Sequence, residues 1–392
     1  MKLDDRLRRD LPRSVEGLTP SSASWNGVER GLVRHARRAA VARVALAVAV
    51  LGGFVGVLLW VASSYLRQTP SPRPLATTPP IQSSPSPLGG EAPGFNPSRV
   101  AFWSPEVGLA VGSAGPCAES CAGAIELTND GGQSWHAVQR TEDAVADVAT
   151  AGSSDGWAVV GSCREPGCDN LILKSDDGGQ TWTELGPAPV YQIDFASGEI
   201  GWGLSVNAAL SGAGGQPVAR TVDGGRTWTE TESPCPPDTP VPSSVDFVDP
   251  DDGWMACVGD AATSQQGKAI FETGDGGATW KPLAAVTYSG GAAGDLGITG
   301  HQPALAFRPD GQGWLWMDRD CLYASTDRGQ SWTRTGTDIC MPDVKFISDL
   351  QFFSDRDGVG LLLDGDASEL QLIQSHDGGA TWSVIHTWPL TR

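Results

Sequence analysis

Residues 128–135 read TNDGGQSW, and the same octapeptide pattern returns five more times along the chain. The later copies are SDDGGQTW (175–182), TVDGGRTW (221–228), TGDGGATW (273–280), STDRGQSW (325–332) and SHDGGATW (375–382). Consecutive copies begin 46 to 52 residues apart. A period of this size, with strand-like flanks, is typical of one four-stranded blade of a β-propeller. We refer to the six octapeptides as the boxes.

The segments between the boxes repeat as well. Each contains an alternating apolar stretch, an acidic turn and then a Gly-Trp pair or a variant of it, as in VDFVDPDDGWMACVG at residues 245–259. Each repeat therefore reads as strand A, a turn, strand B from Gly-Trp, a variable loop, strand C ending in the box, and strand D from the box Trp. Six such repeats fill residues 98–392 and predict an all-β, six-bladed propeller.

The box residues have a structural interpretation. Ser/Thr and Asp side chains can hydrogen-bond turn amides, Gly can adopt positive φ, and Trp can fill the space between neighbouring sheets. One Asp per repeat places each carboxylate on a different blade, which disfavours a joint catalytic role. We assign a structural role to Asp130 and Trp135, Asp177 and Trp182, Asp223 and Trp228, Asp275 and Trp280, Asp327 and Trp332, and Asp377 and Trp382.

The S/T-x-D-x-G-x-S/T-W pattern resembles the Asp-box (BNR) repeat of sialidases, of sortilin-type receptors and of the photosystem II stability/assembly factor family. The D-G-G-x-T-W form with an upstream Gly-Trp is most similar to the last of these. The resemblance covers about three quarters of the chain and implies a six-bladed Asp-box β-propeller. It implies much less about activity, because propellers host enzymes, receptors and scaffolds alike.

A long uncharged segment precedes the repeats. Residues 44–62 read VALAVAVLGGFVGVLLWVA, which as a helix spans a hydrocarbon core of ~30 Å. Basic residues just before it place the N-terminus in the cytoplasm by the positive-inside rule. A cleaved signal peptide is the alternative, disfavoured by the long leader. We expect a basic cytoplasmic arm (1–43), one transmembrane helix (44–66), a Pro/Ser/Thr-rich stalk (67–97) and an extracytoplasmic propeller (98–392) in the cell membrane.

All eight cysteines follow the predicted membrane span, in the compartment expected to be oxidising. A zinc site is the alternative, but the sequence contains no C-x-x-C pair and no neighbouring His cluster. The spacings suggest four local disulfides, which are Cys117–Cys121, Cys163–Cys168, Cys235–Cys257 and Cys321–Cys340.

Loop lengths suggest where a ligand binds. Because propeller strands alternate in direction, the A–B turns and boxes share one rim, and the longer B–C and D–A loops share the other. Long loops on a rigid scaffold often carry binding residues, so we hypothesise that this long-loop rim, braced by the disulfides, is the recognition face. Loop bracing alone is the alternative. The candidate ligand residues are Tyr191, Tyr288, Arg308, Trp316, Arg319 and Tyr323.

These observations favour a membrane-anchored scaffold that binds a protein or a glycan and is not an enzyme. A sialidase-like glycoside hydrolase, the enzyme suggested by the resemblance, would need an arginine cluster and a Tyr nucleophile with a Glu partner. Only Arg99, Arg308 and Arg319 could approach a central channel. A transmembrane sensor whose cytoplasmic arm binds a protein partner is the other alternative.

Charge and composition limit the partners and ligands that the protein can bind. The chain carries a net charge of -19 although residues 1–43 are basic, so the propeller is strongly acidic and nucleic acid is excluded as its partner. We expect no cofactor. Carboxylates within residues 249–252 and 355–357 could ligate calcium, but they are more simply A–B turns.

Overall fold

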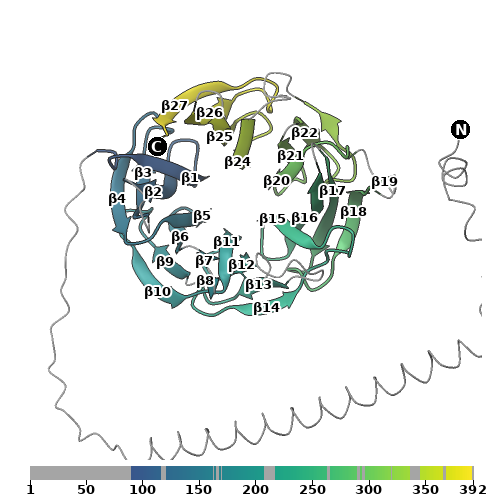
Figure 1. The fold of residues 1–392 in the computed structure, drawn as a ribbon, viewed down its shortest axis with the longest axis horizontal. Coiled ribbons are helices and arrows are strands. Elements are labelled where there is room, and N and C mark those ends of the chain that lie inside the picture. The colour runs from purple at the N-terminus through teal and green to yellow at the C-terminus, as the bar shows by residue number, and fades with distance from the viewer. Residues whose placement is uncertain are drawn as a thin grey trace, which may run out of the picture. The chain divides into compact units, whose positions relative to one another are not determined.

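The computed structural model describes residues 90–390 except 116–120, 162, 165–166, 169, 207–216, 263–264, 289–291, 294–295, 319, 336–344 and 365–367. In this part of the chain, six antiparallel sheets form a ring, as Figure 1 shows, and residues of their six innermost strands line a channel at its centre. The prediction of a six-bladed propeller is therefore confirmed. The predicted cytoplasmic arm and transmembrane helix lie outside the described residues. Within the described ranges, no helix is long and apolar enough to cross a membrane.

Each blade is one contiguous segment whose strands run from the channel outward in chain order. Blade 1 contains β1 (Phe95–Phe102), β2 (Gly108–Ala114), β3 (Gly123–Thr128) and β4 (His136–Thr141). Blade 2 contains β5 (Val145–Ala151), β6 (Asp155–Val160), β9 (Leu171–Ser175) and β10 (Thr183–Pro187), and the short strands β7 (Cys163–Arg164) and β8 (Gly167–Cys168) pair with each other in its B–C loop. Blade 3 contains β11 (Val190–Phe195), β12 (Gly201–Ser205), β13 (Pro217–Thr221) and β14 (Thr229–Glu232).

The second half of the ring follows the same order. Blade 4 contains β15 (Val241–Phe247), β16 (Asp252–Ala262), β17 (Gln265–Gly274) and β18 (Lys281–Val286), with β19 (Ala292–Ala293) added at its outer edge. Blade 5 contains β20 (His301–Phe307), β21 (Gly313–Asp318), β22 (Leu322–Ser325) and β23 (Thr333–Arg334). Blade 6 contains β24 (Lys345–Phe352), β25 (Gly358–Asp364), β26 (Glu369–Ser375) and β27 (Ser383–Pro389). The innermost strands are thus β1, β5, β11, β15, β20 and β24 (Figure 1).

The propeller begins earlier than the predicted boundary at residue 98. Strand β1 starts at Phe95, and both Ala92 and Phe95 are buried in the core. The Pro-rich composition of residues 67–97 suggested a solvated stalk. Its last part is apolar enough to pack against Trp388 of the final blade, which the composition of the whole segment concealed.

Each box is a turn tied together by its own side chains, as box 4 illustrates. The Thr273 hydroxyl donates to Asp275 and accepts from the N–H groups of Asp275 and Gly277, at 2.9, 3.3 and 2.9 Å. The Asp275 carboxylate in turn accepts from the backbone N–H and hydroxyl of Thr279 at 2.7 and 2.6 Å. The Gly276 N–H donates to the Asp251 carbonyl in the A–B turn of the same blade, so box and A–B turn share one rim.

Stacked aromatic rings pack four of the blade junctions. The Trp of strand B lies flat against the Phe that ends the next strand A, and its indole N–H donates to a carbonyl of the next box. The box Trp meets the same Phe edge-on. The repeated tryptophans therefore form the core between sheets. The stacked pairs, with centroid separations, are Trp157–Phe195 (3.8 Å), Trp202–Phe247 (3.3 Å), Trp254–Phe307 (3.9 Å) and Trp314–Phe352 (3.7 Å).

The ring closes without strand exchange, because blade 1 consists wholly of N-terminal strands and blade 6 wholly of C-terminal strands. Side chains join the two blades instead. The Asp349 carboxylate accepts from the Val100 N–H at 2.7 Å. The Gln351 side-chain amide both accepts from the Phe102 N–H at 3.0 Å and donates to the Phe102 carbonyl at 2.8 Å. We call the contact between blades 6 and 1 the closing junction.

Candidate functional site

Every innermost strand contains a β-bulge near its start, at the long-loop end of the channel. The register against strand B shifts by an extra residue at the same place in all six blades. Bulges redirect side chains and are frequent next to binding sites. The bulged residues are Ser98, Ala146, Tyr191, Ser243, the pair Gln302 and Pro303, and Ser348.

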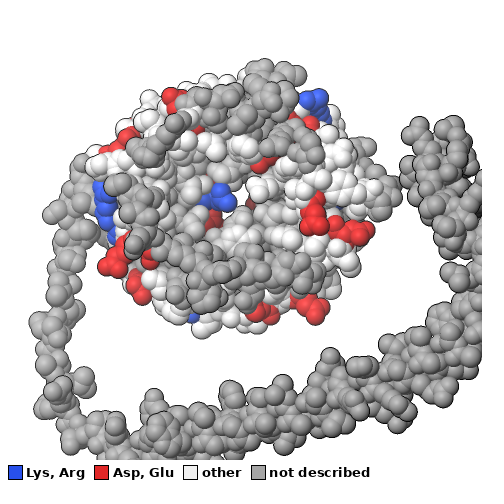
Figure 2. Space-filling view, viewed as in Figure 1, with Lys and Arg blue, Asp and Glu red and all other residues white. Residues whose placement is uncertain are grey.

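These bulges shape a cavity at the mouth of the channel. The cavity has a volume of about 660 Å³, and all of the bulged residues except Ala146 line it. Figure 2 shows this mouth as a hollow at the centre of the ring with charged atoms inside it. Hydroxyl and amide side chains of blades 1, 3, 4, 5 and 6 line the wall. Most of its large apolar side chains come from blade 6 and the residue after it, which are Phe346, Ile347, Leu363, Leu370 and Leu390.

Arg99 lies on the floor of this cavity and bridges three blades. Its Nε atom lies 3.2 Å from Asp147 Oδ1 in blade 2 and 3.6 Å from Asp349 Oδ1 in blade 6. Its side chain is 29% exposed, so part of the guanidinium remains accessible from the channel. Because two carboxylates hold its guanidinium in place, Arg99 can offer a ligand in the cavity a hydrogen-bond donor at a fixed position.

Aspartates farther down the channel also connect neighbouring blades. An innermost strand has no partner on its channel side, so its N–H groups need other acceptors. Carboxylates of the preceding blade supply them. Asp147 accepts from Ile193 N–H and Asp194 from Phe247 N–H, both at 2.6 Å. Asp246 accepts from Phe307 N–H in the same way, and Asp349 from Val100 N–H at 2.7 Å.

Burial dominates the titration of these four channel aspartates. It raises the pKa of Asp147 and of Asp194 to about 7, and the pKa of Asp349 to about 6. Arg99 opposes the shift at Asp147 and Asp349 by stabilising their charged forms. Burial raises the pKa of Asp246 well above its ordinary value, and the charge of Asp194 raises it further.

Of the predicted rim residues that the structure describes, Tyr191 lines the cavity. Tyr288 is 51% exposed and lies outside the cavity wall, with its hydroxyl donating to the carbonyls of Asp260 and Gln265 at the tip of the β16–β17 hairpin. The Tyr323 hydroxyl donates to the Asp320 carboxylate. Arg319 lies outside the described residues.

Two predicted rim residues are located elsewhere. Trp316 is fully buried within β21, and its indole N–H donates to Asp318 at 3.1 Å. It cannot contact a ligand because strand B is covered on both faces by neighbouring blades. Arg308 follows β20 in the A–B turn, where it pairs with Asp310 at 3.1 Å, so it belongs to the rim of the boxes. Loop lengths alone do not distinguish these two positions from residues of the long-loop rim.

The predicted Cys235–Cys257 disulfide is present, with a Cα–Cα distance of 5.5 Å. It fixes the connection before β15 to strand β16. Cys121 and Cys321 are also disulfide-bonded. Cys163 and Cys168 face each other in the register of β7 and β8. Cys117 and Cys340 lie outside the described residues, so the pairings Cys117–Cys121 and Cys321–Cys340 remain predictions. The pairing Cys163–Cys168 agrees with the strand register and is otherwise also a prediction.

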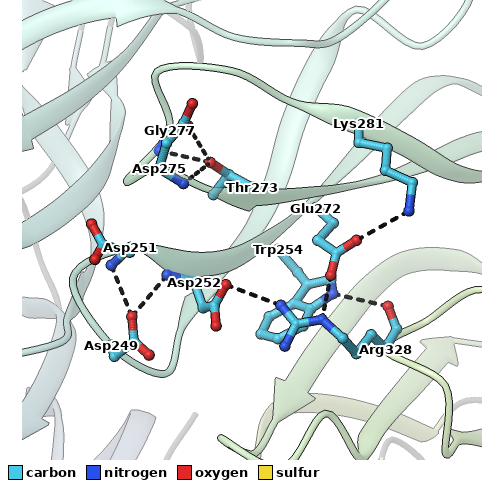
Figure 3. A network of polar contacts seen from close by, with 10 residues as sticks. All are labelled: Asp249, Asp251, Asp252, Trp254, Glu272, Thr273, Asp275, Gly277, Lys281 and Arg328. Carbon is cyan, nitrogen blue, oxygen red and sulfur yellow. Dashed lines mark hydrogen bonds and ion pairs between the residues drawn. The ribbon is translucent and has the colours of Figure 1, made fainter.

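Two of the carboxylates considered for calcium, Asp249 and Asp357, make turn contacts, and Asp252 pairs with Arg328 (Figure 3). The Asp249 side chain accepts from the N–H groups of Asp251 and Asp252, both at 2.8 Å. In blade 6, Asp357 accepts from the Ser354 hydroxyl and contacts His376, both at 2.8 Å. The described residues contain no group of three or more His, Cys, Asp or Glu that could hold a metal ion.

Box 5 departs from the pattern because Arg328 replaces its first glycine. Arg328 adopts a φ of 62°, which is costly for a side chain. Its guanidinium lies 4.8 Å from the Trp254 ring centroid and pairs with Asp252 and Glu272 (Figure 3). In blades 2 and 3, the cation that lies over the strand B Trp comes from strand C of the same blade. It is Lys174 in blade 2 and Arg220 in blade 3.

Glu272 occupies the equivalent strand C position in blade 4, so Arg328 supplies the cation from the next blade. We expect Arg328→Gly to lower the free energy of unfolding by only about 1 kcal/mol, because relief of the positive φ offsets part of the lost ion pairs and cation–π contact. Glu272→Arg alone should cost more, since it opposes Arg328. The double variant should return to within about 0.5 kcal/mol of wild type. Urea denaturation of all four proteins measures this coupling, and simple additivity would contradict it.

Comparison with known proteins finds distant likenesses among solved structures. No family model matches the chain, and no curated protein matches it either. The fold is similar to that of YCF48. The solved structure described as YCF48 bound to a D1 peptide shares 20% identity over 76% of this chain and 84% of its own, with a TM-score of 0.43.

Glycoside hydrolase propellers show a comparable likeness. A Hadza microbial sialidase shares 14% identity over 70% of this chain and 67% of its own, with a TM-score of 0.45. The GH74 xyloglucanase from Xanthomonas campestris shares 14% identity over 76% of this chain, which spans 46% of that enzyme, with a TM-score of 0.49. A shared fold does not by itself imply a shared activity.

Proposed function

We propose that this protein is a membrane-anchored, extracytoplasmic scaffold that binds a polypeptide segment of another protein in the cavity at the channel mouth. The observation that carries this proposal is the bulge that recurs at the start of every innermost strand. The bulges place hydroxyl and amide residues in the wall of one cavity of about 660 Å³, where the Ser98 and Ser243 hydroxyls also donate to strand carbonyls. Bulges are over-represented at barrel rims and next to active sites, and they re-aim side chains there.

The wall chemistry favours a polypeptide. An extended peptide presents both apolar side chains and amide groups, and the cavity offers apolar side chains at blade 6, such as Phe346 and Leu390, together with Gln266, Gln302 and Ser243 of blades 4 and 5. Arg99 on the floor supplies a fixed cationic donor. The channel carboxylates are used between blades, so the proposal assigns them no catalytic role.

Membrane anchorage is the second part of the proposal. It is supported by the nineteen-residue uncharged segment at 44–62 and by the basic residues before it. Cysteines confined to the region after that segment, together with the Cys235–Cys257 disulfide, agree with an oxidising compartment for the propeller. The protein should therefore sediment with membranes and resist extraction by salt, and release of the intact chain by salt would contradict the anchor.

Site-specific photocrosslinking in cells tests the binding site. A benzophenone amino acid at Tyr191, inside the cavity, should capture a protein partner. The same amino acid at Gln180, in box 2 on the opposite rim, is the matched control and should not. Ser243→Arg, which fills the cavity, should abolish the Tyr191 crosslink, whereas Gln180→Arg should leave it unchanged.

The other outcomes each point to a different function. Capture of a glycan without protein at Tyr191 would replace the polypeptide ligand by a carbohydrate. A partner that is lost when residues 1–43 are deleted, and that is indifferent to Ser243→Arg, would favour the sensor. Hydrolysis of a glycoside that depends on Arg99 would show that the protein is an enzyme.

A further inference from the structure

The residues just before β1 cross the closing junction. The Gly90 carbonyl accepts from Ala137 N–H in β4 at 3.1 Å, and Ala92 N–H donates to Glu126 Oε1 in β3 at 2.5 Å. On the other side, Glu91 lies 3.1 Å from His386 in β27 of blade 6. The segment thus runs from the outer strands of two blades inward to β1, and it contacts both blades.

Apolar contacts continue this arrangement. Ala92 and Phe95 belong to the same buried cluster as Leu361, Leu370 and Trp388 of blade 6. The rings of Phe95 and Trp388 are 6.5 Å apart at an interplanar angle of 74°, in edge-to-face contact. The segment therefore fills space between the first and last sheets.

The closing junction lacks the flat indole stack found at four other junctions, although Phe102 meets Trp135 and Phe353 edge-on and Trp135 contacts Trp388 there. Blade 6 has Gly358-Val359 in place of Gly-Trp, so no indole stacks on Phe102 as Trp157 does on Phe195. The junction between blades 1 and 2 also has no such stack, but the chain crosses it covalently. The closing junction has neither the stack nor a covalent connection between its blades.

Buried polar groups at the closing junction are incompletely satisfied. Glu126 is fully buried, its Oε2 atom has no hydrogen-bond partner, and the indole N–H of Trp388 has none either. Buried groups left in this way cost free energy. The segment is held by hydrogen bonds of Gly90, Ala92 and Gly94 to blade 1, by the contact of Glu91 with His386, and by the packing of Ala92 and Phe95. Segments at the end of a domain open more readily than its central strands.

We propose that residues 90–95 act as a clasp that closes the ring between blades 1 and 6, and that the propeller opens first by release of this clasp. The clasp directly precedes Pro97, Ser98 and Arg99, which line the central cavity. It also forms the last part of the predicted stalk, residues 67–97. A pull from the N-terminal side therefore acts on the clasp before it acts on any blade.

Hydrogen exchange on the full-length protein, read by mass spectrometry, tests the clasp. Val100 and Phe102 N–H groups donate to side chains across the closing junction, and Ile193 and Phe247 N–H groups make equivalent bonds at other junctions. In the wild-type protein, peptides containing the first pair should exchange at least about tenfold faster than those containing the second pair. Equal protection would overturn the proposal.

Two variants sharpen this test. Ala92→Pro removes the N–H that binds Glu126 and should speed exchange at Val100 and Phe102 by a further factor of about ten, with Ile193 and Phe247 unchanged. Glu126→Gln keeps an acceptor for that N–H and should leave exchange at Val100 and Phe102 within about threefold of wild type. Faster exchange at every junction alike in Ala92→Pro would show that the segment stabilises the whole domain and is not a clasp. The wild-type comparison stands even if Ala92→Pro fails to fold.

Discussion

The free energy of unfolding of the propeller is expected to fall by roughly 3 to 6 kcal/mol between pH 5 and pH 8. The four channel aspartates have pKa values raised by burial, to about 7 for Asp147 and Asp194 and about 6 for Asp349, with Asp246 raised as well. A carboxyl group with a raised pKa in the folded state binds its proton more tightly there. Its stabilising contribution is complete below about pH 4 and disappears as the pH rises through 6 and 7.

The box aspartates change the free energy of unfolding with pH in the opposite direction. Hydrogen bonds from Ser134 lower the pKa of Asp130, and those from Thr227 lower the pKa of Asp223. Their contribution is present above about pH 4 and is lost in stronger acid. Maximal stability is therefore expected between about pH 4 and pH 6, below the neutral range in which many proteins are most stable.

Chemical denaturation at several pH values measures this profile. Asp194→Asn keeps an acceptor for the Phe247 N–H and removes one titrating group, so it should flatten the profile and raise stability at pH 8. Asp310→Asn on the opposite rim is the control and should leave the profile unchanged. A wild-type profile that is flat or that rises between pH 5 and pH 8 would show that the channel carboxylates stay ionised in the folded protein.

The second large effect concerns Arg99. Arg99→Met is expected to lower the free energy of unfolding by about 3 to 5 kcal/mol at pH 8, because it leaves Asp147 and Asp349 without their counter-charge in a buried site. At pH 5.5 both carboxyl groups are largely protonated, and the loss should shrink to about 1 to 2 kcal/mol. Thermal or urea unfolding at the two pH values provides the measurement.

Arg308→Met is the matched control for Arg99→Met. Arg308 makes one surface ion pair with Asp310, so its replacement should change stability by less than about 0.5 kcal/mol at either pH. An Arg99→Met penalty of the same size at pH 5.5 and pH 8 would mean that Arg99 acts through packing and not through charge.

Local chemistry made the fold predictable from the sequence. The box needs a Ser/Thr, an Asp, glycines at positive φ and a Trp at fixed positions, and these requirements are met within eight residues. Six copies of such a turn therefore show both the sheet number and the rim on which the turns lie. The Gly-Trp pair was equally informative because Trp157 and its equivalents pack against the next blade.

The candidate site was less predictable because it depends on contacts between repeats. The prediction of a long-loop rim included Tyr191 but also the buried Trp316 and the distant Arg308. The bulges are visible in the sequence as breaks in the two-residue alternation of apolar residues along the innermost strands. Buried residues in β11 are Val190, Ile193 and Phe195, which are spaced by three and then two, and this break marks the bulge at Tyr191.

The clasp and the role of Arg99 could not be read from one repeat. Arg99 has no basic equivalent in the other innermost strands, where Asp147, Gln192, Ser244, Ala304 and Asp349 occupy the same position relative to strand B. The role of Arg99 depends on its contacts with blades 2 and 6, and the sequence of a single repeat does not contain those contacts. The clasp in turn was concealed by prolines in the segment from which it emerges.

The contiguous blades also bear on how such a protein can change in evolution. Since no sheet combines strands from both ends of the chain, a single in-frame duplication or deletion of one repeat adds or removes a complete sheet. For the same reason, a circular permutant that starts at the short connection between Pro187 and Val190 would keep every sheet intact. The number of blades in this ring is therefore set by how closely neighbouring sheets pack, and the position of the chain ends imposes no constraint on it.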